Sequence, residues 1–434
     1  MANISADESL NEKWKHIRRL TDRESAFAHP AFEPGVENFD AIQQCRVLVV
    51  GSGGLGCEIL KGLALSGFKY IETIDMDTID LSNLNRQFLF READIGKSKA
   101  EVAANFVNNR VSDVQVVAHN CKIQDKDLNF YRQFSIVICG LDSIVARRWL
   151  NATMCSIVQF DSEGNPDPST IIPLVDGGTE GFKGNARVVF PFFSPCIECT
   201  LDLYPPQINF PLCTIAHTPR LPEHCIEYVK VILWDEKKPF GDESIDGDNP
   251  EHLTWIMNRA QERAKEFNII GVDFRLTQGV VKRIIPAVAS TNAIIAGSCV
   301  LEALKLASNI GCPLDNYLNF SNIDGAFFGP VKLERKENCI VCSKSAIEIE
   351  TSRSSLLKTF LDVLIEKYQL KEPSIRTAEH FIYLINSLFP DAEKVSKENL
   401  EKSLEEIKLA NGDEILVSDD TLAEAITLRV KYTD

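Results

Sequence analysis

The stretch RVLVVGSGGLGCEIL, residues 46–60, decides the fold, because an apolar run meets a cluster of glycines and then resumes at helical spacing. Gly51, Gly53 and Gly56 match G-x-G-x-x-G, the pattern of a strand, a tight turn and a helix whose amino end faces phosphate. A second apolar run, YIETIDMD, carries Asp75 about 20 residues after the last glycine, where a ribose-binding carboxylate belongs. The stretch therefore predicts a nucleotide site, and the glycines alone leave the nucleotide open.

The rhythm around this stretch indicates the fold class. Short β-rich runs alternate with helical patterns over residues 40–145, which is typical of a parallel sheet with crossover helices. We therefore expect a doubly wound, Rossmann-like α/β domain. Near residue 205 the chain becomes rich in Pro and Cys, and an apolar segment later resumes the core. The predicted division is 1–205 for the first part of the α/β domain, 206–283 for a mainly helical insertion, 284–346 for the second part and 347–434 for a separate acidic module.

Composition limits the partners and the compartment. The 434 residues hold 46 Lys plus Arg against 62 Asp plus Glu, a net charge of −16, so we expect no nucleic-acid partner. Thirteen cysteines without an apolar leader in the first twenty residues predict reduced thiols in the cytoplasm and nucleus. The uncharged segment Ile284 to Leu301 contains too many small and polar residues for a membrane span, so we expect a buried helix and no membrane partner.

Polar side chains follow Asp75 closely. They are Asp77, Asn83, Arg86, Gln87 and, on the next predicted helix, Lys99. A dinucleotide needs no such pair of cations and amides, whereas a triphosphate does. Asp142 ends a further predicted strand at the edge where open α/β sheets bind ligands. A carboxylate beside phosphates is repulsive unless a cation intervenes, so Asp142 suggests Mg²⁺, with a purely structural aspartate as the alternative.

The cysteines offer two further predictions. Two C-x-x-C pairs, Cys196 with Cys199 and Cys339 with Cys342, together supply the four thiolates of a structural zinc site. A redox dithiol would need only one pair and remains the alternative.

Cys213 lies between two prolines, with His217 and Arg220 nearby to stabilise a thiolate, and is the candidate nucleophile. Cys225 is its rival. Burial as a small apolar side chain is the ordinary role of a cysteine and remains the alternative for both.

The chain resembles the activating enzymes of ubiquitin-like proteins in five motifs: GSGGLG, IDMDTIDLSNLNRQFLF, IGKSKA, GLDSIVARRW and PLCTIAHTPRLPEHC. The similarity runs from about residue 40 to 345, and more weakly to the end. It implies an adenylation domain, an inserted catalytic-cysteine domain and a C-terminal ubiquitin-like, β-grasp α+β domain. The implied activity is ATP-dependent activation of a modifier of the neddylation type: adenylation of its C-terminal glycine, a thioester on Cys213 and transfer to a conjugating enzyme.

The resemblance also implies the roles of residues. The nucleotide-binding set is Gly51, Gly53, Gly54, Gly56, Asp75 for the ribose, Asp77, Asn83, Gln87 and Asp142 for Mg²⁺, with Arg86 and Lys99 acting on the phosphates in catalysis. Arg187 matches an arginine near the modifier's tail that repels ubiquitin, which has an arginine where the neddylation modifier has an alanine. His217 departs from the small polar residue expected there. Because the chain carries one adenylation half, the resemblance implies a regulatory partner subunit of the amyloid-precursor-binding type.

Three alternatives stay open at this point. A sumoylation-type activating subunit would share the motifs, although we expect a longer insertion and a basic tail in that case. An NAD-dependent oxidoreductase would explain the glycines but would leave the polar segment and both cysteine pairs without a role. An inactive scaffold subunit of the same class should lack residues equivalent to Arg86, Lys99, Asp142 or Cys213, and all four are present.

Overall fold

The computed structural model describes residues 6–204, 219–241, 243, 245–247, 249–282, 287–343, 347–377, 380–385, 390–423 and 425–433. The chain divides into two compact units. Unit 1 comprises Met1–Tyr204 and Ala287–Asp434, and unit 2 comprises Pro205–Pro286. Cys213 and His217 lie outside the described residues.

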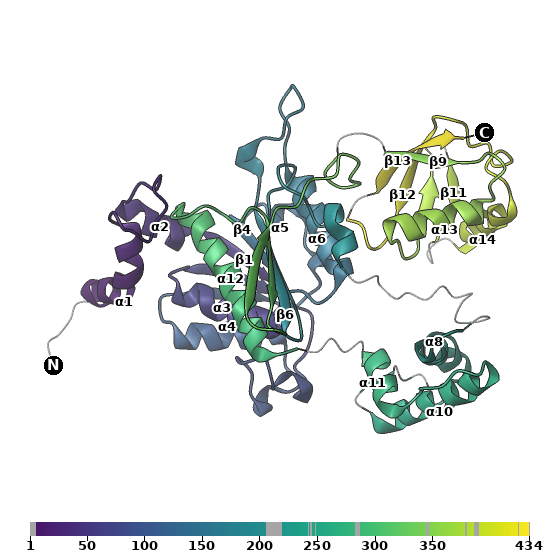
Figure 1. The fold of residues 1–434 in the computed structure, drawn as a ribbon, viewed down its shortest axis with the longest axis horizontal. Helices are drawn as coiled ribbons and strands as arrows, with labels where there is room; N and C mark the ends of the chain where they lie inside the picture. The colour runs from purple at the N-terminus through teal and green to yellow at the C-terminus, as the bar shows by residue number, and fades with distance from the viewer. Residues whose placement is uncertain are drawn as a thin grey trace. The chain divides into compact units, whose positions relative to one another are not determined.

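Unit 1 is built around an eight-stranded sheet with the order β3-β2-β1-β4-β5-β6-β7-β8 (Figure 1). The strands are β1 Arg46–Val50, β2 Tyr70–Ile74, β3 Gln115–His119, β4 Ile136–Cys139, β5 Leu174–Glu180, β6 Lys183–Val189, β7 Tyr317–Ser321 and β8 Phe327–Val331. The first five in chain order pair in parallel, and β5 to β8 continue as antiparallel neighbours. The predicted doubly wound α/β class is confirmed. The sheet is extended by antiparallel strands, of which β7 and β8 follow the insertion in the chain.

The two faces of the sheet carry separate cores, because both faces of a parallel strand are buried. Val47 and Val49 of β1 face one core, while Leu48 and Val50 face the other. The first core lies beneath α1 Ala6–Thr21, α2 Val36–Gln44, α3 Gly54–Leu65, α4 Lys99–Arg110 and α12 Ala289–Ser308 (Figure 1). The second lies beneath α5 Leu128–Tyr131 and α6 Ile144–Ile157. The predicted buried helix near residues 284–301 is thus α12.

The C-terminal part of unit 1 has a core of its own. Its five-stranded sheet has the order β11-β10-β12-β13-β9, with β9 parallel to β13 and the other pairs antiparallel. The elements are β9 Ile347–Thr351, α13 Leu357–Tyr368, β10 Ser374–Arg376, β11 Phe381–Tyr383, α14 Pro390–Lys397, β12 Glu414–Ser418 and β13 Ile426–Tyr432. Apolar residues of α13 such as Leu361 and Leu364 pack on this sheet, which gives the predicted β-grasp arrangement.

Unit 2 is helical in its described residues. The helices are α8 Pro222–Tyr228, the π-helical turn η6 Val229–Leu233, α9 Trp234–Lys237, α10 Pro250–Glu266 and α11 Phe274–Lys282. Cys225, Ile226, Trp234 and Ile256 form the centre of its core. Among the described residues of the whole chain, none of the helices has the length and apolar character needed to cross a membrane.

Candidate active site

The glycine loop between β1 and α3 is shaped by close backbone contacts. Gly51 has φ +95°, in the left-handed region that favours glycine. A Cβ on Gly56 would lie 1.9 Å from the carbonyl oxygen of Gly51, and a Cβ on Gly51 would lie 2.8 Å from that of Gly140. Side chains at these positions would therefore push α3 away from the ends of β1 and β4. The glycines bring the amino end of α3 to the edge of the sheet, where it can face an anion.

Asp75 follows β2 and is tied to this loop. Its Oδ2 accepts a hydrogen bond from the backbone N–H of Ser52 at 2.6 Å, and its Oδ1 accepts one from the N–H of Asp77 at 2.8 Å. Burial raises the pKa of the Asp75 carboxyl, while the two backbone hydrogen bonds oppose that rise. The carboxylate is thereby held in one orientation beside the glycine loop.

Lys99 and Asp77 form an ion pair at the same edge, with 2.8 Å between Lys99 Nζ and Asp77 Oδ2. An isolated β-bridge between Thr78 and Ser98 brings the two segments together. Ser98 also caps α4 through its side chain, so Lys99 occupies the first position of that helix. The Lys99 side chain is mostly buried, whereas that of Asp77 is half exposed. A phosphate that approaches this edge would meet an ammonium group already fixed in place.

Asn83, Arg86 and Gln87 lie in and after a short 3₁₀ turn, Leu81–Asn83. Asn83 Oδ1 accepts a hydrogen bond from the N–H of Asp80 at 2.9 Å and so shapes the turn itself. Arg86 donates to the carbonyl of Ser82 at 2.9 Å.

Two of these side chains run along the glycine loop. A Cβ on Gly54 would lie 3.4 Å from Cγ of Arg86, and one on Gly53 would lie 3.9 Å from Nε2 of Gln87. The buried Oε1 of Gln87 has no hydrogen-bond partner among the described residues. The predicted phosphate ligands from this segment therefore lie beside the loop that they were predicted to serve.

Asp142 lies at the same edge, two positions after Gly140, which contacts the glycine loop. The residue after it, Ser143, caps α6 by accepting a hydrogen bond from the N–H of Ala146. Asp142 itself is exposed. A solvent-facing carboxylate at the carboxyl ends of β1 and β4 has the oxygen chemistry that Mg²⁺ prefers.

The four cysteines predicted as metal ligands come together. The Sγ atoms of Cys196, Cys199, Cys339 and Cys342 all lie within 4.8 Å of one another, and all four residues are buried. Neighbouring sulfurs are 3.4 to 3.8 Å apart. Four thiolates around a tetrahedral zinc at ~2.3 Å would be separated by ~3.8 Å, so the donor set and its spacing fit zinc.

Of the two candidate nucleophiles, only Cys225 is described. It is fully buried in the core of unit 2, and burial raises the pKa of its thiol. Both properties disfavour a reactive thiolate.

Arg187, on β6, lies in a buried polar cluster and is 3% exposed. Its guanidinium donates to Thr200 Oγ1 at 2.6 Å and to Tyr204 Oη at 2.7 Å. Its Nε lies 3.5 Å from Oδ2 of Asp176, whose other oxygen accepts from Arg147 at 2.8 Å. Two guanidinium groups thus share one carboxylate, which leaves a net positive charge in the cluster.

Sequence reasoning missed the partners of Arg187. Asp176 is fully buried on β5, and Arg147 reaches it from α6. The only local signal was an aspartate followed by two glycines inside an apolar strand, LVDGG. It also missed Asn292 on α12, whose place beside Gly54 depends on a contact between distant segments.

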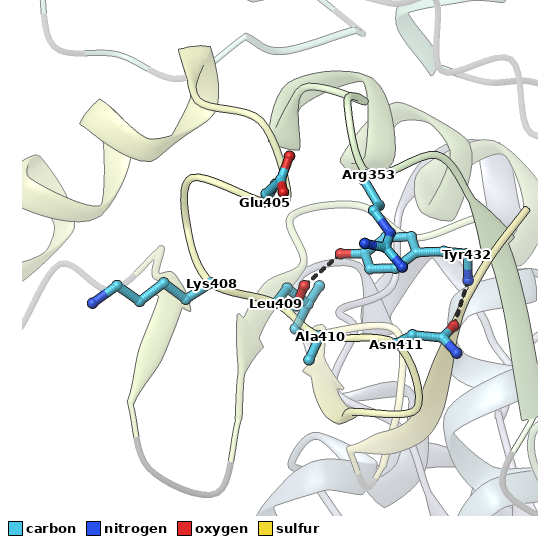
Figure 2. Close-up of a pocket in the computed structure, with 7 residues that line it drawn as sticks. All are labelled: Arg353, Glu405, Lys408, Leu409, Ala410, Asn411 and Tyr432. Atoms are coloured by element: carbon cyan, nitrogen blue, oxygen red, sulfur yellow. Dashed lines mark hydrogen bonds between the residues drawn. The ribbon is translucent and has the colours of Figure 1, made fainter. Parts of the chain in front are cut away.

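A pocket of about 290 Å³ lies on the C-terminal sheet domain, away from all of these residues (Figure 2). Figure 2 shows Tyr432 closing one side, with its hydroxyl donating to the carbonyl of Leu409 and its N–H to Asn411. Its lining residues include none of those predicted for the active site.

The comparisons agree with this architecture. The model of the ThiF family matches residues 27–341, and that of the E2 binding domain matches residues 350–432. The ThiF match covers the glycine loop, unit 2 and three of the four clustered cysteines, and it ends one residue before Cys342. The fold and the site thus define the class of ThiF-type enzymes that carry an E2-binding domain.

Particular relatives narrow the class. The "NEDD8-activating enzyme E1 catalytic subunit" of Caenorhabditis elegans is 60% identical over 99% of this chain and 99% of that protein. The "Nedd8-activating enzyme E1 catalytic subunit" of Drosophila melanogaster is 50% identical over 97% of this chain and 95% of that protein. The "SUMO-activating enzyme subunit 2" of Dictyostelium discoideum is 26% identical over 94% of this chain and 80% of that protein. The chain belongs to the family of NEDD8-activating enzyme E1 catalytic subunits, which are ATP-dependent enzymes; the sumoylation-type and oxidoreductase alternatives are not favoured.

Proposed function

We propose that this chain adenylates the C-terminal glycine of a neddylation-type modifier at the edge of the sheet described above. It then takes the modifier as a thioester on Cys213 and passes it to a conjugating enzyme. The observation that carries the proposal is the position of Lys99, which is fixed beside Asp75 and the glycine loop by its ion pair with Asp77. A buried, fixed ammonium group at the amino end of a helix is suited to stabilising charge on a triphosphate.

The chemistry consists of two displacements. A carboxylate oxygen of the modifier attacks the α-phosphorus of ATP, the bond from that phosphorus to the bridging oxygen breaks, and pyrophosphate leaves. Lys99 and Arg86 offset the negative charge that moves onto the leaving group. The Cys213 thiolate then attacks the acyl carbonyl, and AMP leaves as the carbon–oxygen bond breaks.

Asp142 is the residue that would hold Mg²⁺, which offsets phosphate charge when bound. It is exposed at the correct edge, so its loss should leave the fold intact. Asp142→Ala should abolish ATP–pyrophosphate exchange, and normal exchange would remove Asp142 from the mechanism.

The two half-reactions provide the decisive experiment. Cys213→Ala should retain modifier-dependent ATP–pyrophosphate exchange but form no thioester, because adenylation uses other residues. Cys225→Ala is the matched control and should retain both, since Cys225 is a buried core thiol. Loss of the thiol-sensitive adduct in Cys225→Ala, with its survival in Cys213→Ala, would show that the wrong cysteine was assigned.

The four-cysteine cluster is proposed as a structural zinc site. Its support is the buried, all-thiolate donor set, which joins the segment after β6 to the segment after β8. Replacing Cys199 or Cys342 should release zinc and destabilise unit 1. A purified chain without zinc by elemental analysis would contradict the proposal.

Further parts of the proposal concern partners, domains and compartment. The match to an E2-binding domain supports docking of a conjugating enzyme, and the single adenylation half supports a regulatory subunit of the amyloid-precursor-binding type. The four-part domain division given above is part of the proposal. None of the described cysteines forms a disulfide bond, which supports a cytoplasmic and nuclear location. Co-purification of the chain with its candidate partner tests the heterodimer.

A further inference from the structure

Two helices from distant parts of the chain start side by side at the active-site edge. α3 begins at Gly54, directly after the glycine loop, and α12 begins at Ala289. A Cβ on Gly54 would lie 2.5 Å from Nδ2 of Asn292, and a Cβ on Gly62 would lie 2.8 Å from Cγ2 of Val300. The step from Gly54 to Gly62 in α3 matches the step from Asn292 to Val300 in α12, in the same chain direction. The two helices therefore run parallel. Their positively polarised amino ends therefore meet at one point.

Asn292, in the first turns of α12, is 3% exposed at this meeting point. Its Oδ1 accepts a hydrogen bond from the Thr179 hydroxyl at 2.6 Å, which fixes the plane of the carboxamide. None of the described residues accepts a hydrogen bond from its Nδ2. Nδ2 itself is not fully shielded from solvent, so a molecule that enters this edge of the sheet can supply the acceptor that the described residues do not.

The surroundings of Nδ2 determine what that acceptor is. A Cβ on Gly54 would lie 2.5 Å from Nδ2 and 3.4 Å from Cγ of Arg86. A donor flanked by two helix amino ends and an arginine stem favours a negatively charged oxygen over a neutral carbonyl. The site also explains Gly54, because any side chain there would collide with the carboxamide.

We propose that Asn292 donates a hydrogen bond to an oxyanion of the reactants held at the glycine loop, and is thus a further binding residue of the adenylation reaction. This inference rests on the proposed function. Two reactants carry such an oxygen, namely the phosphates of ATP and the C-terminal carboxylate of the modifier. The shared chemistry is an oxyanion at the junction of α3 and α12.

Asn292→Asp tests the inference in the complete heterodimer. Aspartate has nearly the same shape and keeps an acceptor for Thr179, but it replaces the donor with a negatively charged oxygen. Asn292→Ala removes the donor without adding charge. A hydrogen bond to a charged group changes affinity by about 10- to 100-fold. Both variants should therefore weaken binding by at least about tenfold.

Two measurements distinguish the sources. The Kd of Mg·ATP is measured by calorimetry without modifier, and the KM of the modifier is measured by pyrophosphate exchange at saturating ATP. A weaker Kd assigns the oxyanion to a phosphate, and a raised modifier KM with unchanged Kd assigns it to the carboxylate. Ser308→Ala is the matched control, because Ser308 is equally buried at the other end of α12 and should change neither value.

An unchanged Kd and an unchanged KM in Asn292→Ala would overturn the inference, whatever the folding of Asn292→Asp. Such a result would not contradict the proposed function, because that function is tested by pyrophosphate exchange in the wild-type heterodimer. Failure of the wild-type heterodimer to exchange pyrophosphate with any modifier would instead contradict the proposed function, and the calorimetric measurement would still test Asn292 against ATP.

Discussion

Cys57 lies in α3, immediately after the glycine loop, with its thiol shielded from water. Its S–H donates to the carbonyl of Ser52 at 3.4 Å, and burial raises its pKa to about 12. In the unfolded chain a cysteine ionises near pH ~8.5. Between these values the folded state holds a proton that the unfolded state loses, so the free energy of unfolding falls as the pH rises.

We therefore predict that Cys57→Ala flattens the pH dependence of stability in this window. Its slope should be shallower than that of wild type by up to about 1.4 kcal/mol per pH unit. Urea unfolding at pH 8, 9 and 10, followed by circular dichroism, measures the slopes. Parallel slopes would show that Cys57 ionises as readily in the folded protein as in the unfolded chain.

Arg187 provides a second prediction at this scale. We propose, as the family resemblance implies, that its charge repels the arginine of ubiquitin's tail. Its buried cluster retains a positive charge beyond what Asp176 neutralises. Arg187→Ala should raise the ratio of ubiquitin to neddylation-modifier thioester rates by about tenfold or more, because a repulsion is removed. Asp176 keeps Arg147 as a partner, so the fold should survive.

Arg187→Lys is the control for this prediction. Lysine keeps the charge but cannot reproduce the paired hydrogen bonds to Thr200 and Tyr204. It should keep most of the discrimination against ubiquitin. An unchanged ratio in Arg187→Ala would reassign the residue to structure.

At the residue scale, sequence predicts what depends on local spacing. The glycine loop and Asp75 follow from short patterns, and each C-x-x-C pair follows from the two ligands that one turn can supply. The burial of Arg187 and the donor on Asn292 could not be predicted, because both depend on contacts between strands and helices far apart in the chain. A charged or amide side chain gives no local sign of such a contact.

At the scale of elements, Arg148 connects α6 to the segment of the first cysteine pair and to the C-terminal sheet domain. This buried guanidinium pairs with Glu198, which lies between Cys196 and Cys199. It also donates to the carbonyl oxygens of Tyr368 and Gln369 at 2.7 Å each. These carbonyls end α13, where the helix leaves acceptors unpaired and a cation is favourable.

Arg148→Met should destabilise the chain strongly, by about 3–5 kcal/mol, because Glu198 would remain buried without its partner. Burial already raises the pKa of Glu198, against the opposing effect of Arg148. Adding Glu198→Gln should recover part of the loss, since the unpaired charge is removed. A double-mutant cycle by urea unfolding measures the coupling, and strictly additive losses would show that the two side chains act independently.

The order of elements was largely predictable, but their pairing was not. The β-rich and helical runs of residues 40–145 correspond to β1 to β4 with α3 and α4. The segment NYLNFSN, residues 316–322, contains β7. Its antiparallel pairing with β6, across the whole insertion, was not predictable because strand direction there depends on where the chain returns to the sheet.

At the scale of the whole molecule, unit 1 contains two kinds of core. The larger sheet has one on each face, and the C-terminal sheet domain has a separate one formed by residues from Ile347 to Val430. An apolar core of its own is what allows a segment to fold independently. We therefore expect each of the two bodies joined by the Arg148 hydrogen bonds to be stable without the other.

This separation predicts the result of deleting residues 347–434. In the proposed function the truncated chain, with its partner subunit, should still exchange pyrophosphate and form the Cys213 thioester at close to the full-length rate. Arg148 would lose two carbonyl acceptors but keep Glu198, so no unpaired charge is left buried. Transfer to the conjugating enzyme should slow by about tenfold or more at low enzyme concentration, because the E2-binding domain is gone. The full-length double variant Arg148→Met with Glu198→Gln is the comparison, since it keeps that domain, loses the Arg148 hydrogen bonds to it and leaves no unpaired charge on residue 198; its transfer should fall less. Equal transfer rates in the truncated and full-length enzymes would contradict a docking role for this domain, and loss of pyrophosphate exchange on truncation would show that the two cores depend on each other.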